Sequence, residues 1–315
     1  MSDLFKSKIN SEIKPWVENN CIDGFFPSFD GLDIHYYYAI NEKRKGSIVM
    51  VHGFCEFFAK YHELAYYLYQ AGYSIFFLEL RGHGKSGSEN KKFDDHRVSV
   101  KSFGHYVSDL RIFIDDVVIP KSNHDNLYLY CHSMGGTVGA EFIAFYPKVF
   151  KAAVLSSPML EVNYGSVPLI GVQFLALYSK IACLDEEYAP GQHSFDGVYN
   201  FENSSCDDED RYKYQFDWRL KDEDYQMYGG SWSWVRSAGM ASFEATISAK
   251  DNVVPTLICK AKNDTTVKIS GIDYYNDLCL ASSLVEYNSK HEIYNSTDDI
   301  FKKYVDDILV YYGAH

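Results

Sequence analysis

Apolar runs of strand length alternate with amphipathic stretches over the middle of the chain. Between residues 47 and 158, the expected strands cover residues 47–51, 73–80, 127–130 and 152–155. The expected helices cover residues 58–71, 107–119 and 137–145, and the second of them is expected to stop at Pro120. Strands and helices that alternate in this way predict a mostly parallel, doubly wound sheet with crossover helices.

Further strands and helices are expected before residue 47 and after residue 255, and a long stretch without this alternation precedes the later ones. Further strands are expected at residues 25–28, 33–40, 256–261 and 283–287, and further helices at residues 269–280 and 300–311. From about residue 160 to 250, strand signals are poor and Trp, Tyr and acidic residues are frequent. This stretch predicts an insertion over the carboxyl edge of the sheet, where ligands bind in such folds. We therefore expect a core of residues 1–160 and 250–315 and a cap of residues 161–249.

Composition narrows the class of protein. Of the 315 residues, 46% are hydrophobic and 23% are charged, which favours a large folded core over a disordered chain. The formal net charge of −13 would repel nucleic acid, so no nucleic-acid partner is expected. No apolar run approaches the roughly 18 residues that a membrane span requires, so no integral membrane segment is expected.

The seven cysteines are scattered along the chain without a C-x-x-C pair. This pattern favours reduced thiols over a disulfide framework or a zinc site. Residues 1–20 are polar and charged, without the apolar core of a signal peptide. We therefore expect a cytoplasmic protein that needs no metal or other cofactor.

Ser133 is the strongest candidate for chemistry. An apolar run ends at Cys131-His132-Ser133-Met134-Gly135, and a helical pattern starts at once, as in a strand–turn–helix nucleophile elbow. The elbow pattern is usually G-x-S-x-G, and Cys131 departs from it. The alternative interpretation is a buried serine between a strand and a helix.

A serine nucleophile needs a base, and the base needs an acid that orients it. In elbow enzymes the chain order is Ser, then Asp or Glu, then His. Asp264 follows the strand expected at residues 256–261, and His291 follows the strand expected at residues 283–287. Taken singly, Asp264 could be a turn former and His291 a loop histidine. Their joint placement at strand ends predicts a Ser133–Asp264–His291 triad.

Two backbone N–H groups should stabilise the oxyanion of such an enzyme. One is expected from Met134, directly after the nucleophile. The other is expected from Phe54, in the loop His52-Gly53-Phe54 after the strand at residues 47–51. A strand-end turn is the alternative interpretation of that loop.

These segments resemble the α/β-hydrolase superfamily, and more narrowly its monoacylglycerol lipase and lysophospholipase L2 group. The matching segments are His52-Gly53-Phe54, Arg81-Gly82-His83-Gly84-Lys85-Ser86, His132-Ser133-Met134-Gly135-Gly136, Asn263-Asp264 and Lys290-His291-Glu292. The resemblance implies a mostly parallel eight-stranded sheet flanked by helices, with a helical cap. It also implies a serine carboxylic-ester hydrolase that cleaves single-acyl lipid esters through an acyl-enzyme.

The resemblance further implies that aromatic residues cover the acyl group of a small acyl ester or lysolipid. The candidates are Phe57, Trp218, Trp232 and Trp234, for which packing of the cap on the core is the alternative. Transient contact with a membrane surface would suit such a substrate. A short-chain carboxylesterase, a thioesterase and a non-catalytic ligand-binding protein of the same fold stay open, as do the acyl length, the head group and the oligomeric state.

Overall fold

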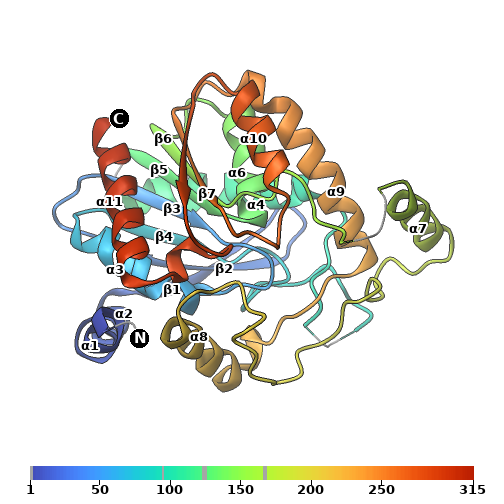
Figure 1. Cartoon of the computed structure of the whole chain (residues 1–315), viewed down its shortest axis with the longest axis horizontal. Helices are drawn as coiled ribbons and strands as arrows, with labels where there is room; N and C mark the ends of the chain where they lie inside the picture. Colours follow the sequence, from blue (N-terminus) through green and yellow to red (C-terminus); the bar gives the residue numbers. More distant parts are fainter. Residues whose placement is uncertain (1–2, 94–95, 123–125, 166–168) are drawn as a thin grey trace.

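The protein is built around one twisted sheet with helices on both of its faces (Figure 1). The computed structural model describes residues 3–93, 96–122, 126–165 and 169–315. Within these ranges the sheet has eight strands in the order β1-β2-β4-β3-β5-β6-β7-β8. Only β2 runs against the others, and the pairs from β4 to β8 are all parallel. The mostly parallel eight-stranded sheet that the resemblance implied is confirmed.

The strands agree closely with the apolar runs of the sequence. They are β1 Ile22–Pro27, β2 Asp33–Ala39, β3 Ser47–Val51, β4 Ser74–Leu78, β5 Leu127–His132, β6 Ala152–Ser156, β7 Thr256–Ala261 and β8 Ser282–Tyr287. In the central strands, side chains alternate between the two faces, and both faces are buried. Because both faces of β3 to β7 are covered, these strands read as continuous apolar runs in the sequence.

Two helical layers cover the sheet (Figure 1). One layer contains α4 Phe103–Phe113, α6 Met134–Phe145, α9 Trp232–Ile247 and α10 Ile269–Leu278. The other contains α1 Asp3–Lys8, α2 Lys14–Asn20, α3 His62–Gln70 and α11 Asp298–Ala314. The remaining helices are α5 Ile119–Ser122, α7 Leu169–Ile181 and α8 Glu209–Lys221. The short π- and 3₁₀-turns are η1 Ile9–Ile13, η2 Phe58–Tyr61, η3 Ile114–Val118, η4 Glu223–Tyr225, η5 Ser248–Asp251 and η6 Ile293–Asn295.

The helices at the start of the chain were not expected from the sequence. Phe5, Ile9, Ile13 and Trp16 are buried against the second layer, where they join the core formed by α3 and α11. Their spacing of four, four and three residues is that of one apolar helix face. The charged residues between them lie on the opposite face. They lower the mean hydropathy of the segment, so the apolar face is not evident from its overall composition.

The helix expected to stop at Pro120 continues to Ser122, and that prediction is wrong. The π-turn η3 separates α4 from α5, and the Ile119 N–H donates to the Ile114 carbonyl, five residues back. Asp115 and Asp116 on this turn are exposed, so water can satisfy the carbonyls that Pro120 leaves without a donor. A proline is thereby tolerated without breaking the helix.

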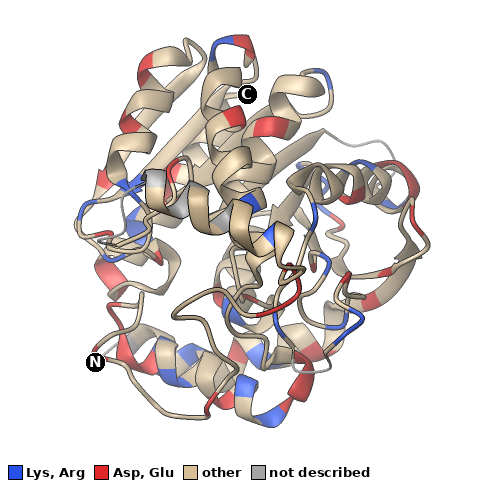
Figure 2. Cartoon of the chain, turned by 90° about the vertical axis from the view of Figure 1, so that its right-hand side faces the viewer, with Lys and Arg blue, Asp and Glu red and all other residues tan. Residues whose placement is uncertain are grey.

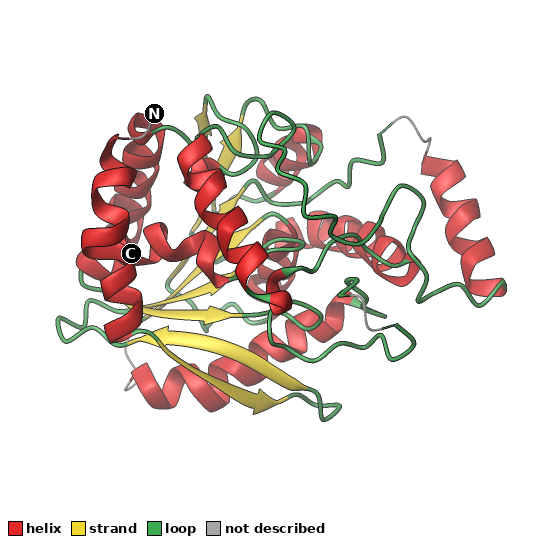
Figure 3. Cartoon of the chain, turned by 90° about the horizontal axis from the view of Figure 1, so that it is seen from below, coloured by secondary structure: helices red, strands yellow, loops and turns green. Residues whose placement is uncertain are grey.

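The segment between β6 and β7 carries α7, α8 and α9. α9 packs along α6, and α7 lies at the outer edge of the molecule, where it contacts α9 (Figures 1 and 3). Charged residues are spread over the outer helices and loops (Figure 2). No helix within the described ranges is long and apolar enough to cross a membrane.

Candidate active site

Ser133 occupies a sharp turn between β5 and α6. β5 ends at His132, α6 begins at Met134, and Ser133 has φ 52° and ψ −118°. For a residue other than glycine, this combination of φ and ψ costs about 1–3 kcal/mol of strain. Such a conformation persists only where the surrounding structure enforces it. Backbone hydrogen bonds enforce it here, because Ser133 N–H donates to Ser156 at 3.0 Å and Met159 N–H donates to Ser133 at 2.9 Å.

Glycines around the serine allow the neighbouring chains to come this close. A Cβ on Gly135 would lie 2.5 Å from the His52 carbonyl oxygen, and one on Gly136 would lie 2.5 Å from the Pro158 ring. A Cβ on Gly53 would lie 2.9 Å from the Ser133 Cβ. The turn therefore requires glycine at these positions for reasons of space.

Cys131, which departs from the usual elbow pattern, is accommodated by a glycine on the following helix. Cys131 is fully buried, and a Cβ on Gly139 would lie only 2.4 Å from its sulfur. Gly139 thus leaves room for the Cys131 side chain, which the usual glycine at position 131 would not need. The turn keeps its geometry because the extra volume is absorbed one helical turn further along.

Ser133, His291 and Asp264 form one hydrogen-bonded chain. The Nε2 atom of His291 lies 2.8 Å from Ser133 Oγ, and its Nδ1 atom lies 2.6 Å from Asp264 Oδ2. Ser133 and His291 are buried, and the three residues come from loops after β5, β7 and β8. The structure therefore brings together the three residues that the sequence predicted.

Asp264 is held as a carboxylate. Burial raises the pKa of Asp264, but the hydrogen bond with His291 and N–H donors from Thr266 and Val267 outweigh burial, so the pKa lies below its usual range. The backbone donors bind Oδ1, which leaves Oδ2 for the imidazole. An ionised Asp264 would orient His291 and stabilise its protonated form.

The two backbone N–H groups predicted for an oxyanion lie on either side of Ser133. Met134 is the first residue of α6, and Phe54 follows Gly53 in the loop after β3. Neither N–H donates to an acceptor within the described ranges. The start of α6 also contributes the positive end of a helix dipole at this point.

Sequence reasoning missed a buried ionic cluster beside this site, formed by Glu56, Lys60 and Glu292. Lys60 Nζ lies 3.2 Å from Glu56 and 2.8 Å from Glu292. Glu56 accepts the Gly53 N–H at 2.5 Å, and Glu292 directly follows His291. The cluster therefore joins the loop with Phe54 to the loop with His291. A carboxylate three residues after a strand-end glycine was the available signal.

His132 is buried behind the base. Its ring centroid lies 4.8 Å from that of His291, and burial lowers the pKa of His132 to about 4. His132 is therefore neutral near pH 7 and adds no positive charge next to the imidazolium that His291 would form. No pattern in the sequence indicates this role.

Ser133 opens into an apolar pocket of about 380 Å³. Trp232 and Trp234, two of the four aromatic residues expected around the acyl group, line this pocket together with Phe54, the expected oxyanion donor. The other lining residues are Met159, Val162, Asn163, Tyr164, Leu175, Ala189, Pro190, Gln192, Val235, Thr266 and Val267. Among the described residues, no side chain that lines the pocket carries a charge, which suits an apolar ligand.

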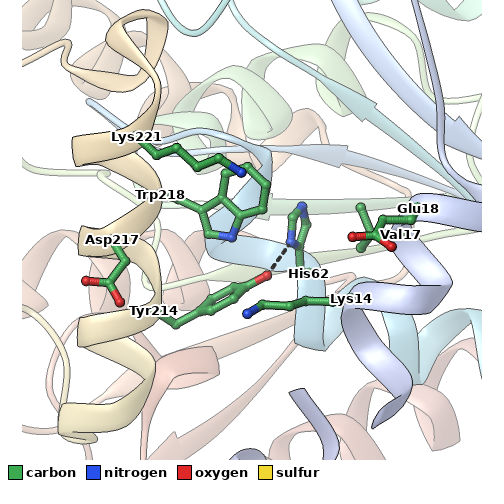
Figure 4. A pocket seen from close by; sticks show the side chains of 8 residues that line it. All are labelled: Lys14, Val17, Glu18, His62, Tyr214, Asp217, Trp218 and Lys221. Carbon is green, nitrogen blue, oxygen red and sulfur yellow. Dashed lines mark hydrogen bonds between the residues drawn. The ribbon is translucent and has the colours of Figure 1, made fainter. Parts of the chain in front are cut away.

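Phe57 and Trp218 do not line this pocket. Phe57 is fully buried and stacks on Tyr225 with ring centroids 4.4 Å apart. Trp218 lines a separate pocket between α2 and α8, where His62 Nδ1 lies 2.8 Å from the Tyr214 hydroxyl (Figure 4). For these two residues the structure favours the packing alternative, because α8 directs Trp218 away from Ser133.

Comparison with known proteins places these features in context. Lysophospholipase L2 of Escherichia coli (strain K12) is 25% identical over 298 residues, which cover 92% of this chain and 87% of that protein. A monoglyceride lipase homolog of monkeypox virus is 27% identical over 274 residues, which cover 84% of this chain and 88% of that protein.

Solved structures show the same fold at low sequence identity. The monoglyceride lipase of Saccharomyces cerevisiae, solved as a soluble variant with a substrate analog, aligns with a TM-score of 0.73 and 18% identity over 93% of this chain and 94% of that one. A carboxyl esterase of Bacillus coagulans aligns with a TM-score of 0.74 and 14% identity over 94% and 98%.

The model of one protein family matches most of the chain. Its description is serine aminopeptidase, S33, and the match extends over residues 42–296. This range includes Ser133, Asp264, His291 and the cluster beside them. The chain therefore belongs to the S33 serine aminopeptidase family of α/β hydrolases.

Proposed function

We propose that the protein is a serine hydrolase that cleaves single-acyl lipid esters, as a lysophospholipase or monoacylglycerol lipase does. The observation that carries the proposal is the hydrogen-bonded chain from Ser133 through His291 to Asp264 at the base of an uncharged, aromatic pocket. The names of the relatives, lysophospholipase L2 and monoglyceride lipase, support the same substrate class.

The pocket favours lipid esters over peptides, although the family description names an aminopeptidase. A peptide amino terminus carries a positive charge, and an aminopeptidase needs an acceptor to hold it. In the part of the chain that the structure describes, no carboxylate lines the pocket around Ser133. Burying an uncompensated ammonium group there would cost several kcal/mol, whereas an acyl chain gains free energy on burial.

The proposed mechanism uses the chain's own groups in two half-reactions. Ser133 Oγ attacks the ester carbonyl while His291 takes its proton, and Asp264 stabilises the imidazolium. The N–H groups of Phe54 and Met134 stabilise the oxyanion. His291 then protonates the leaving alcohol, and water activated by His291 cleaves the acyl-enzyme to release the fatty acid.

We also propose that α7 contacts the surface of the lipid aggregate that supplies the substrate. Phe174, Leu177, Tyr178 and Ile181 form one exposed stripe on α7, with Phe174 68% and Ile181 74% exposed. Leu175 on the same helix lines the pocket of Ser133. An apolar helix face at the mouth of a lipid pocket is typical of interfacial binding.

Charge indicates which lipid surface α7 would contact. Lys180 is the one charged residue between positions 162 and 184, while the whole chain has a net charge of −13. A strongly acidic protein is repelled by anionic membranes. We therefore propose a neutral or zwitterionic surface.

The remaining predictions concern organisation and compartment. We propose that residues 161–249, which carry α7, α8 and α9, act as a cap on a core of residues 1–160 and 250–315. All seven cysteines are unbridged. A reducing compartment suits such a chain, and we propose the cytoplasm.

The test is labelling with a fluorophosphonate probe together with hydrolysis of a monoacylglycerol, a lysophosphatidylcholine and an aminoacyl p-nitroanilide. We expect the wild type to be labelled and to cleave the two lipids but not the anilide. Ser133→Ala should abolish labelling and lower kcat by roughly 10⁴-fold or more.

Ser231→Ala provides a matched control. Ser231 is also buried and begins a helix after two glycines, but its hydroxyl bonds Ser99 and Ser233. This variant should keep full labelling. A folded wild type that the probe does not label would refute the proposed function and favour a ligand-binding protein, and cleavage of the anilide alone would favour an aminopeptidase.

A further inference from the structure

A second apolar groove lies beside the pocket that contains Ser133. It has a volume of about 530 Å³ and lies between α9, α10 and residues 160–165. α9 and α10 run side by side at this edge of the molecule (Figure 1). The volume is within the roughly 300–1,000 Å³ of pockets that bind small molecules.

The two charged side chains that line this groove, Glu161 and Lys268, pair with each other. Glu161 accepts from Lys268 Nζ at 2.9 Å and from Ser270 Oγ at 2.7 Å. The rim is apolar and largely exposed, and Phe243, Ile247 and Tyr274 contribute to it. Within the described ranges, the groove therefore offers no unpaired charge to a polar ligand, but it offers apolar surface to a hydrocarbon.

Residues 159–165 separate the groove from the catalytic pocket. Met159 and Asn163 face the catalytic pocket, Leu160 and Glu161 face the groove, and Val162 and Tyr164 line both. The two cavities are therefore neighbours across a single stretch of chain. Residues 159–165 thus form a wall between the two cavities. An acyl chain bound at Ser133 that extended past this wall would enter the groove.

Most of the wall is fixed by hydrogen bonds. Met159 N–H donates to Ser133, and Lys268 N–H donates to the Glu161 carbonyl at 3.1 Å. Val162 forms a bridge to Val267, and Asn163 Nδ2 donates to the Thr265 carbonyl at 2.9 Å. These bonds fix the wall up to Asn163.

The side chain of Tyr164 is the exception. Its hydroxyl has no hydrogen-bond partner within the described ranges, and it rests against α9 at Gly239, where a Cβ would lie 2.4 Å from the hydroxyl oxygen. Tyr164 is thus held by packing alone. A rotation of this ring requires no hydrogen bond to break and would remove the upper part of the wall.

We propose that the groove accepts the distal part of long acyl chains, and that Tyr164 is the specificity-determining residue that separates it from the catalytic pocket. This inference rests on the proposed ester hydrolase function and names the acyl subsite of that function. The catalytic pocket of 380 Å³ holds the part of the chain next to the ester, and the groove holds the remainder.

The test compares kcat/KM for p-nitrophenyl butanoate and p-nitrophenyl dodecanoate, both below their micelle concentrations so that α7 has no surface to bind. Tyr164→Ala should raise the dodecanoate-to-butanoate ratio at least tenfold, since each further buried methylene contributes roughly fourfold. Ile247→Trp, which fills the groove from its rim, should lower the ratio. The double variant should resemble Ile247→Trp.

Two control variants separate this role from general effects on the fold. Tyr164→Phe keeps the ring and should keep the wild-type ratio within twofold. Tyr146→Ala removes an exposed tyrosine at the far end of α6 and should also leave the ratio unchanged. Butanoate hydrolysis should persist in Ile247→Trp and Tyr146→Ala, whose sites lie outside the pocket of Ser133, and this reports on the proposed function separately.

Two results would overturn the inference. One is an unchanged ratio in both Tyr164→Ala and Ile247→Trp while butanoate is still cleaved. The other concerns dodecanoic acid itself, whose binding is measured by calorimetry and requires no turnover. Binding that is equal in the wild type and in Ile247→Trp would assign the groove to another occupant.

Discussion

Two helices of the segment between β6 and β7 are held in opposite ways. α8 is fastened to the rest of the protein by the buried Arg211, whose guanidinium lies 2.7 Å from Glu63 on α3 and 2.9 Å from Asp298 on α11. Arg211 also donates to the Ser296 carbonyl at 2.8 Å. α7 instead exposes Phe174, Leu177, Tyr178 and Ile181.

The difference separates two tasks. α8 is tied to α3 and to the chain just after His291, so its position follows that of the base. α7 contributes Leu175 to the catalytic pocket and leaves its outer face to the surroundings. The anchoring of α8 suits a helix that stabilises the fold and the geometry of the site, and the exposure of α7 suits the contact with lipid that we propose. Variants of each helix should affect one property and spare the other.

The largest effect is expected from Arg211→Met. This variant leaves the buried Glu63 without its partner, and breaking a buried ion pair on one side costs about 3–5 kcal/mol. Urea unfolding measures the loss. The control is Lys213→Met on the same helix, where an exposed pair with Asp217 should be worth less than about 1 kcal/mol. Equal effects of the two variants would contradict the anchoring role of Arg211.

The second effect concerns α7. Replacing Phe174 and Ile181 by serine should weaken binding to phosphatidylcholine vesicles by roughly tenfold to a hundredfold, because two large apolar side chains no longer enter the interface. Co-sedimentation measures binding, and the free energy of unfolding should stay within about 0.5 kcal/mol.

Leu220→Ser is the matched control for α7, because Leu220 is an exposed apolar residue on α8. If α7 alone contacts lipid, this variant should bind vesicles as the wild type does. The distinction between the two helices would fail if Leu220→Ser weakened binding as much as the α7 variant.

A third, smaller effect concerns α6, the helix on which α9 packs. Gly139→Ala should cost about 1–2 kcal/mol, because its Cβ would lie 2.4 Å from the Cys131 sulfur. Adding Cys131→Gly should restore most of the loss, and thermal unfolding of both variants measures it. Additive losses in the double variant would show that the two residues do not share one space.

The positions of Ser133, Asp264 and His291 could be predicted because they depend on topology. Carboxyl ends of parallel strands meet at one edge of a sheet, so the order of strands and motifs along the chain was enough. The continuous apolar runs of β3, β5 and β6 predicted buried strands, because both faces of a central parallel strand are covered by helices. These features are local, or follow from one rule about the whole sheet.

The roles of the aromatic residues could not be predicted in the same way. Trp218 and Trp232 both lie in helices rich in aromatic residues, yet only Trp232 lines the pocket of Ser133. The face that α8 presents depends on Arg211 and its partners on α3 and α11, which are distant in the sequence. Contacts of this range leave no pattern in a single sequence.

The smallest effect should come from the contact between α6 and α9, which contains one unfavourable group. Glu141 on α6 is buried, its Oε1 atom has no hydrogen-bond partner within the described ranges, and Glu244 on α9 is nearby. Burial, followed by the charge of Glu244, raises the pKa of Glu141 to about 8 from an ordinary value of 4.5. Between these two values the folded protein binds a proton that the unfolded chain does not, so stability falls as pH rises through this window.

Glu141→Gln removes this titration and should therefore stabilise the protein at high pH, where the buried carboxyl of the wild type is ionised. We expect its Tm to exceed that of the wild type by roughly 2 °C at pH 8.5 and to match it at pH 5, because the wild-type carboxyl is already neutral there. Glu244→Gln, on the exposed side of the contact, should shift Tm less in the same direction. If the Tm difference is the same at both pH values, the effect comes from packing. The contact between α6 and α9 would then not depend on pH.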